Sequence, residues 1–226
     1  MVSIAVRSWV RYLVPFTLLS ALALSPLLYL AVKVAPPANA DTARAQLRLA
    51  WIFGATAWAF QYWLVAGVAP AVRGVASGAT LSQWRALCAG GANLVRAIVP
   101  SAIAITAVVL GGVALVVPGL VMVVLVSLTG ASTRLGEDAP AAVRESVELV
   151  RANLRTIAVV VLAIVALDLA ITLGSQLAIV PAFSKKTTAA KLKPIAELVR
   201  VVALALVVIS PLVATSLAAL ATKKRA

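Results

Sequence analysis

The chain has no histidine and a single cysteine, Cys88. It therefore lacks the side chain that most often acts as a general base, and that most often binds a metal ion, near neutral pH. One cysteine allows neither an intrachain disulfide nor a zinc site built from several thiolates. These absences exclude most familiar catalytic centres. We expect a protein that is not an enzyme and that binds no metal and no cofactor.

Charged residues are also scarce. They make up 12% of the 226 residues, whereas 63% are hydrophobic and the mean hydropathy is +1.07. A soluble core cannot hide so large a share of apolar side chains in a chain of this length. The sequence therefore predicts an all-α integral membrane protein, a polytopic bundle of transmembrane helices that forms one domain over residues 1–226.

Acidic residues are the rarer charged type, with 7 Asp and Glu against 20 Lys and Arg, so that the formal net charge is +13. In a soluble chain this excess would suggest a nucleic-acid-binding protein. Here the basic residues cluster between apolar runs and at both ends, where they fit topology determinants and anchors to anionic headgroups. We expect membrane lipids as partners and no nucleic acid. The predicted anchors are Arg7, Arg11, Lys223, Lys224 and Arg225.

The apolar runs predict about six membrane spans. They cover residues 12–34, 49–72, 97–116, 119–133, 156–177 and 198–219. The first span has an alternative, because a basic start, an apolar run and Ala38-Asn39-Ala40 before Asp41 resemble a cleaved secretory signal. Since the run is long enough to cross a bilayer, we favour a retained helix over residues 1–40.

The central run contains a Pro-Gly break. No charged residue lies between Arg96 and Arg134, and one straight helix over that interval would be roughly 55 Å long, against a hydrocarbon core of about 30 Å. Pro118 cannot continue a hydrogen-bonded helix, and Gly119 tolerates a tight reversal. We predict a short hairpin of two spans that meet at residues 116–119. The alternative is a kinked span followed by a re-entrant segment.

Two amphipathic helices are predicted outside the spans, over residues 80–96 and 140–155. In the first, Thr80 and Gln83 have the spacing of a capping box, in which Thr80 would be the N-cap. Its apolar face holds Leu81, Trp84, Cys88, Ala92 and Val95. The apolar stripe of the second holds Val143, Val147, Val150 and Leu154. Such helices lie in the membrane interface or pack against the cytoplasmic end of a bundle.

A family resemblance follows from residues 116–155, VVPGLVMVVLVSLTGASTRLGEDAPAAVRESVELVRANLR. They combine Pro-Gly between apolar runs, an acidic pair, and a Pro-started helix that ends in Arg before another apolar run. This pattern resembles the membrane domain attached to some glycerophosphodiester phosphodiesterases, and it is similar to related uncharacterised six-helix bacterial inner-membrane proteins. The resemblance covers roughly residues 70–175 and implies a fold and a location. It implies no active site, because it does not extend to the metal-dependent phosphodiesterase domain of that family.

The fifth predicted span contains one charged residue, Asp168. Burying a carboxylate at such depth in a membrane costs several kcal/mol of free energy unless it is protonated or paired. Thr172 and Ser175 follow it at i+4 and i+7, and Gln61 lies at a similar depth in the second span. These four residues form a hypothetical intramembrane polar site. It would serve either as the path of a proton, a cation or a polar substrate, or as hydrogen-bonded packing within the bundle.

The basic residues also predict the orientation. With both termini in the cytoplasm, the cytoplasmic segments hold more Lys and Arg than the external loops. We therefore expect a multi-pass protein of the bacterial inner membrane. Two functions fit it. The first is a non-enzymatic scaffold, assembly or regulatory component that contacts lipids and other membrane proteins or copies of itself. The alternative is a small transporter or channel built around Asp168.

Overall fold

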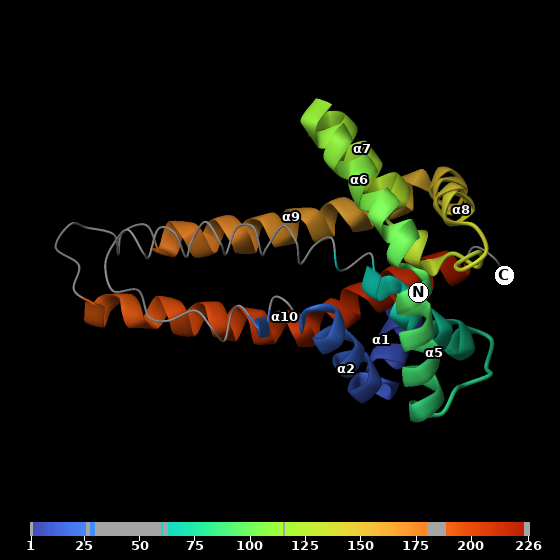
Figure 1. The fold of residues 1–226 in the computed structure, drawn as a ribbon, viewed down its shortest axis with the longest axis horizontal. Helices are drawn as coiled ribbons and strands as arrows, with labels where there is room; N and C mark the ends of the chain where they lie inside the picture. Colours follow the sequence, from blue (N-terminus) through green and yellow to red (C-terminus); the bar gives the residue numbers. More distant parts are fainter. Residues whose placement is uncertain are drawn as a thin grey trace.

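The computed structural model describes residues 2–25, 28–29, 60, 63–114, 116–179 and 189–223. Every regular element in this part of the chain is a helix, which confirms the predicted all-α class. Two long helices, α9 (Leu154–Ile179) and α10 (Ala189–Lys223), lie along the length of the molecule. The shorter helices gather at one end of this pair, and a helical hairpin projects from that end (Figure 1).

The N-terminal segment consists of two helices, α1 (Val2–Arg11) and α2 (Leu13–Ala23). Tyr12 separates them with a φ of −112° and a ψ of 30°. Its side chain is fully buried, and its hydroxyl donates a hydrogen bond to the carbonyl oxygen of Leu81 at 2.9 Å. Both helices pack against α10. The basic start of the chain is thus itself helical, and the first predicted span is described over residues 12–25 and 28–29.

Of the second predicted span, the structure describes residue 60 and the helix Trp63–Ala76. Small residues bring this helix very close to α5 (Gln83–Arg96). A Cβ atom added at Gly90 would lie 2.5 Å from the carbonyl oxygen of Gly67. The two backbones are therefore in direct contact. At the far end of the contact, the indole Nε1 of Trp63 donates to the carbonyl oxygen of Leu94 at 2.5 Å.

The predicted capping box at the start of α5, with Thr80 as the N-cap, is wrong. Ser82 is the N-cap, and its hydroxyl accepts a hydrogen bond from the backbone N–H of Arg85 at 3.3 Å. Thr80 instead accepts a hydrogen bond from the guanidinium of Arg11 at 3.0 Å. The nearer serine satisfies the free N–H groups of the first turn, which leaves Thr80 available for a tertiary contact.

The apolar face predicted for α5 lies on the outside of the described structure. Trp84 is 72% exposed and Val95 is 68% exposed. The packed face is instead formed by Ala86, Gly90 and Leu94.

A helical hairpin follows, formed by α6 (Ile98–Ala114) and α7 (Val116–Val126). The two helices pack along each other (Figure 1). At their crossing, a Cβ atom added at Gly111 would lie 3.2 Å from the carbonyl oxygen of Pro118 and 3.3 Å from the Cα of Gly119. The reversal thus precedes the Pro-Gly pair. Pro118 lies in the first turn of α7, where its missing N–H removes no helical hydrogen bond.

A short 3₁₀ helix, η1 (Thr129–Ala131), and a loop connect the hairpin to α8 (Ala139–Arg151). The packed stripe of α8 is centred one residue before the predicted one. Its buried residues are Ala142, Ser146 and Val150, whereas Val143 and Val147 are half-buried and Leu154 is exposed. Small side chains at the centre let α8 approach the hairpin closely, and the valines flank this contact.

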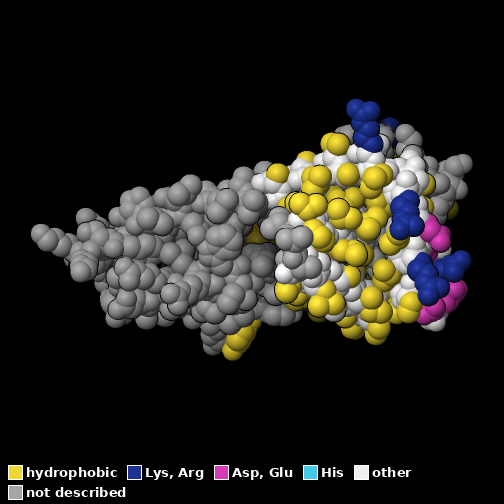
Figure 2. All heavy atoms as spheres, turned by 90° about the horizontal axis from the view of Figure 1, so that it is seen from above, with side chains coloured by type: hydrophobic (Ala, Val, Ile, Leu, Met, Phe, Trp, Pro, Cys, Tyr) yellow, Lys and Arg dark blue, Asp and Glu magenta, His cyan; other side chains and the backbone are white. Residues whose placement is uncertain are grey.

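Candidate membrane spans in the described residues number one to three. The segment Leu204–Thr222 of α10 is long and apolar enough by itself. Two bent pairs qualify if each counts as one span: α5 with α6, bent by 54°, and α8 with α9, bent by 106°. Figure 2 shows the matching surface, a broad apolar field with charged side chains gathered mainly at one end. These features support a membrane location, and the count of six spans stays a prediction.

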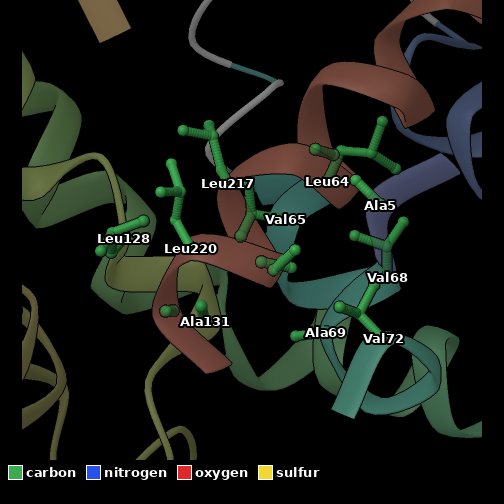
Figure 3. Packing of buried hydrophobic residues seen from close by; sticks show 14 of the residues in the cluster. Ala5, Leu64, Val65, Val68, Ala69, Val72, Leu128, Ala131, Leu217 and Leu220 are labelled. Carbon is green, nitrogen blue, oxygen red and sulfur yellow. The ribbon is translucent and has the colours of Figure 1, made fainter. Parts of the chain in front are cut away.

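The core joins segments that are far apart in the sequence. Figure 3 shows Ala5 of α1, Val65 and Val68 of the helix Trp63–Ala76, and Leu217 of α10 converging on one cluster. Leu128 and Ala131, beside the base of the hairpin, belong to the same cluster. Much of the face that α10 contributes is alanine, at positions 214, 218 and 221. Helices that meet through such small residues pack closely, as is common between membrane helices.

Candidate functional site

The intramembrane polar site predicted from the sequence is only partly within the described structure. Asp168, Thr172 and Ser175 all lie in α9, which is helical from Leu154 to Ile179. Their spacing of four and three residues places them on one face of this helix. Asp168 lies roughly 21 Å along α9 from its first residue, at 1.5 Å per residue. The side chains of these three residues, and Gln61 altogether, lie outside what the structure describes.

Among the predicted lipid anchors, Arg7 and Arg11 are exposed on α1. Arg11 is also held by the protein: its guanidinium donates to Thr80, and its carbonyl oxygen accepts from the side-chain amide of Gln83 at 2.6 Å. Its guanidinium carbon lies 5.9 Å from the centre of the Tyr12 ring. Arg11 therefore ties the end of α1 to the start of α5. Lys223 is the last residue of α10, whereas Lys224 and Arg225 lie outside the described residues.

The structure reveals a polar cluster that sequence analysis missed, between Glu145 of α8 and the loop after η1. The carboxylate accepts hydrogen bonds from the hydroxyl of Ser132, and from the backbone N–H and the hydroxyl of Thr133, the latter two at 3.0 Å. The hydroxyl of Ser132 also accepts from the backbone N–H of Arg134 at 3.0 Å. Hydrogen bonds to a charged acceptor are the stronger kind. Glu145 thus fixes the loop to α8.

Ser146, the next residue, joins α8 to the hairpin. Its hydroxyl donates to the carbonyl oxygen of Leu125 at 2.9 Å and accepts from the backbone N–H of Leu128 at 3.2 Å. Ser146 is fully buried. The bond to Leu125 satisfies a carbonyl at the end of α7, where a helix leaves its last carbonyls without partners. Together with Glu145, Ser146 holds α8 in one position against α7.

The opposite face of α8 is charged and exposed. Arg144, Glu148 and Arg151 follow each other at i, i+4 and i+7, and all three are exposed. We call these three residues the α8 ridge. Because α9 turns away from α8 by 106°, the ridge runs almost at right angles to the long helices. Charged side chains of both signs mark the corresponding end of the molecule in Figure 2.

In the part of the chain that the structure describes, no group of three or more His, Cys, Asp or Glu side chains is placed to hold a metal ion. In the Glu145 cluster, which consists of Glu145, Ser132 and Thr133, the carboxylate already accepts hydrogen bonds from both hydroxyls. The α8 ridge leaves two cations and one anion exposed at this end of the molecule.

Nearly the whole chain, residues 3–224, matches the model of one protein family, described as Domain of unknown function (DUF7847). The chain belongs to this family. No curated protein and no solved structure matches it. The match spans the described helices and the residues between them, and the description of the family names no activity.

The resemblance to the membrane domain of glycerophosphodiester phosphodiesterases stays a hypothesis for this DUF7847 chain. The match to the family covers both predicted amphipathic helices and the hairpin between them. Of the segment that carries the resemblance, the structure contains the Pro-started helix α8 and then the apolar helix α9, in the predicted order.

Proposed function

We propose that this chain is a non-enzymatic, multi-pass component of the bacterial inner membrane, which acts as a scaffold, an assembly factor or a regulatory subunit. In this proposal its long helices cross the bilayer with both termini in the cytoplasm. The charged end of the molecule, which carries the α8 ridge, meets lipid headgroups and partner proteins, either other membrane proteins or further copies of the chain.

The observation that carries the proposal is the fixed position of α8. If α9 follows the membrane normal, the 106° turn lays α8 nearly in the plane of the membrane surface. Its buried side then packs on the base of the hairpin, while the α8 ridge faces the cytoplasm. Ser146 and the Glu145 cluster hold this arrangement in place. A charged helix held in one orientation is suited to docking a partner, because little conformational entropy is lost on binding.

The exposed apolar face of α5 supports the lipid part of the proposal. Trp84 and Val95 point away from the protein, while Arg85 and Arg96 are exposed on the same helix. Tryptophan is enriched at the level of the headgroups, and basic residues bind anionic lipids there. We propose that α5 lies in the interface at the same end as α8.

The test is native mass spectrometry of the chain purified from its own membrane in mild detergent. We expect a complex with a protein partner in fixed stoichiometry and with retained anionic lipid. Arg144→Glu in the α8 ridge should lose the protein partner, whereas Arg85→Glu, the same charge reversal on α5, should keep it. A monomer without any protein partner, or equal loss in both variants, would contradict docking through α8.

A transporter or channel is the second candidate, and the continuity of α9 favours it. Because α9 is helical without a break through residues 168–175, Asp168, Thr172 and Ser175 share one face of this helix, between roughly 21 and 32 Å along it from Leu154. Intramembrane carboxylates often mark ion or proton paths. In this case Asp168→Asn should abolish a flux through reconstituted vesicles while the protein remains folded. An unchanged flux would remove this candidate.

A further inference from the structure

The outer part of the α6–α7 hairpin has an unusual surface. Residues 107–126, AVVLGGVALVVPGLVMVVLV, include no polar side chain. Both helices expose large apolar residues there: Val113 is 81% exposed and Val117 is 69% exposed. The exposed apolar residues continue on both sides of the tip, at Val109, Leu110, Leu120 and Val121. Water is therefore a poor environment for this part of the hairpin on every side that the structure leaves open.

The base of the hairpin lies at the charged end of the molecule. Arg96 is the last residue of α5, and its side chain packs over Gly136 in the loop before α8, where an added Cβ would lie 3.1 Å from the Cδ of Arg96. Gly136 has a φ of +93°, which favours glycine at this contact. Both ends of the hairpin are thus held at the level of the loop that carries Arg134. The hairpin enters the apolar phase from that level and returns to it.

The hairpin is too short to reach the opposite membrane surface. With its 17 residues, α6 is roughly 26 Å long at 1.5 Å per residue, and α7 with its 11 residues covers only about 17 Å. The hydrocarbon core measures about 30 Å. The hairpin also runs obliquely to the α9 and α10 pair rather than alongside it (Figure 1). Tilt reduces the depth that a helix of given length can reach.

The sequence of the tip agrees with a position inside the hydrocarbon. A turn that emerges at the far surface would usually carry charged residues or the aromatic residues of the interface. The tip has neither. The turn also leaves few backbone N–H and C=O groups without a helical hydrogen bond. The helix α7 begins two residues after α6 ends, and Pro118 in its first turn has no N–H to leave unsatisfied.

We propose that the outer part of the hairpin, residues 107–126, is a re-entrant wedge in the leaflet nearest the charged end. It contacts the acyl chains of that leaflet and stops short of the opposite surface. Two of the six predicted spans, 97–116 and 119–133, are then replaced by one element that enters and leaves on the same side. The side on which the later residues lie does not change, so only probes at the tip distinguish the two arrangements.

The experiment uses the full chain with Cys88→Ser, so that each introduced cysteine is the only one. Val113→Cys and Val117→Cys probe the tip, where a smaller side chain removes no packing. Arg144→Cys reports the charged side, and Val208→Cys in α10 reports the hydrocarbon. Each variant is treated with a membrane-impermeant maleimide from either side of sealed vesicles and, separately, after solubilisation in detergent. A second sample carries an NBD probe and is reconstituted with lipids bearing nitroxides on their acyl chains.

The wedge predicts that both tip cysteines resist the maleimide from either side, react fully in detergent, and carry a probe quenched about as strongly as that at position 208. Reaction from the side opposite Arg144→Cys would show two complete spans and overturn the proposal. Reaction from the same side would place the tip in water, with the same result. Protection without quenching by acyl nitroxides would show that a protein surface, such as a second copy, covers the tip instead of lipid.

Discussion

Gly90 of α5 and Gly67 of the helix Trp63–Ala76 bring two helix backbones into direct contact. A Cβ atom at position 90 would lie 2.5 Å from the carbonyl oxygen of Gly67 and 2.6 Å from the Cδ1 of Leu19. Leu19 can move, but a helix backbone cannot do so without moving the whole helix. This contact fixes α5, and with it the direction in which the chain enters the hairpin.

Gly90→Ala should therefore strongly lower the stability of the protein. Overpacking a close contact costs about 1–3 kcal/mol, and we expect the upper end or more because a backbone atom is struck. Gly91→Ala is the matched control, because an added Cβ there meets nothing within 4 Å. It should be neutral or stabilising by up to about 1 kcal/mol, through higher helix propensity. Melting temperatures in detergent, followed by size-exclusion chromatography, measure both. Equal melting temperatures for the two variants would contradict the close contact.

Ser146→Ala should loosen α8 from the hairpin. The substitution removes the acceptor of the Leu128 N–H and the donor to the Leu125 carbonyl, both in a buried setting. An unsatisfied buried polar group costs about 1–3 kcal/mol. Ser77→Ala is the control, since Ser77 is exposed and its hydroxyl donates to the carbonyl oxygen of Gly74 within its own turn. The same thermal measurement should show a clear loss for Ser146→Ala and little change for Ser77→Ala. No difference between them would argue against a docking role for Ser146.

Glu145→Ala should release the loop between η1 and α8. Three hydrogen bonds to the carboxylate hold Ser132 and Thr133, immediately before the exposed Arg134. Because bonds to a charged group contribute about 1.5–3 kcal/mol, trypsin should cleave after Arg134 roughly tenfold faster or more. Mass spectrometry of the fragments measures the rate. Glu148→Ala, one turn short of the end of α8 and exposed, should leave the rate unchanged; acceleration in both variants would point to general unfolding of α8.

Trp63→Phe should weaken the contact between its helix and α5. The substitution keeps an aromatic ring and removes the indole N–H that donates to the carbonyl of Leu94. We expect a loss of about 1 kcal/mol or slightly more. Trp84→Phe, on the exposed face of α5, is the control and should leave stability unchanged within about 0.5 kcal/mol. The outcome that would contradict this reading is a larger loss for Trp84→Phe, measured as a difference in melting temperature.

Sequence patterns were sufficient for the type and order of the strongest elements. Composition alone predicts an all-α membrane class, because so many apolar side chains have no other environment. Pro140 predicts the start of α8, since proline is favoured in a first turn. The apolar run after Arg155 predicts α9 almost to its ends. These features are local, and they do not depend on which surfaces meet.

Features that depend on contacts between distant segments were predicted poorly. Thr80 matches a capping motif, yet its hydroxyl is used by Arg11, a residue 69 positions away. The packed stripe of α8 is centred on Ala142 and Ser146, because small residues allow close approach, and a hydrophobic pattern gives them little weight. The Glu145 cluster escaped notice for a related reason. From sequence alone, a glutamate on a helix beside arginines is interpreted as a solvent-exposed charge, because the sequence does not show that the preceding loop folds back onto it.

The most direct test of the account is the side of the membrane on which α8 lies. Arg144→Cys in the Cys88→Ser chain carries one cysteine, on the exposed ridge. An impermeant maleimide should label it in inverted inner-membrane vesicles and leave it unlabelled in spheroplasts, while the chain stays in the membrane through carbonate extraction. Labelling in spheroplasts would reverse the proposed orientation. Release by carbonate would contradict the central claim that this protein is built into the membrane.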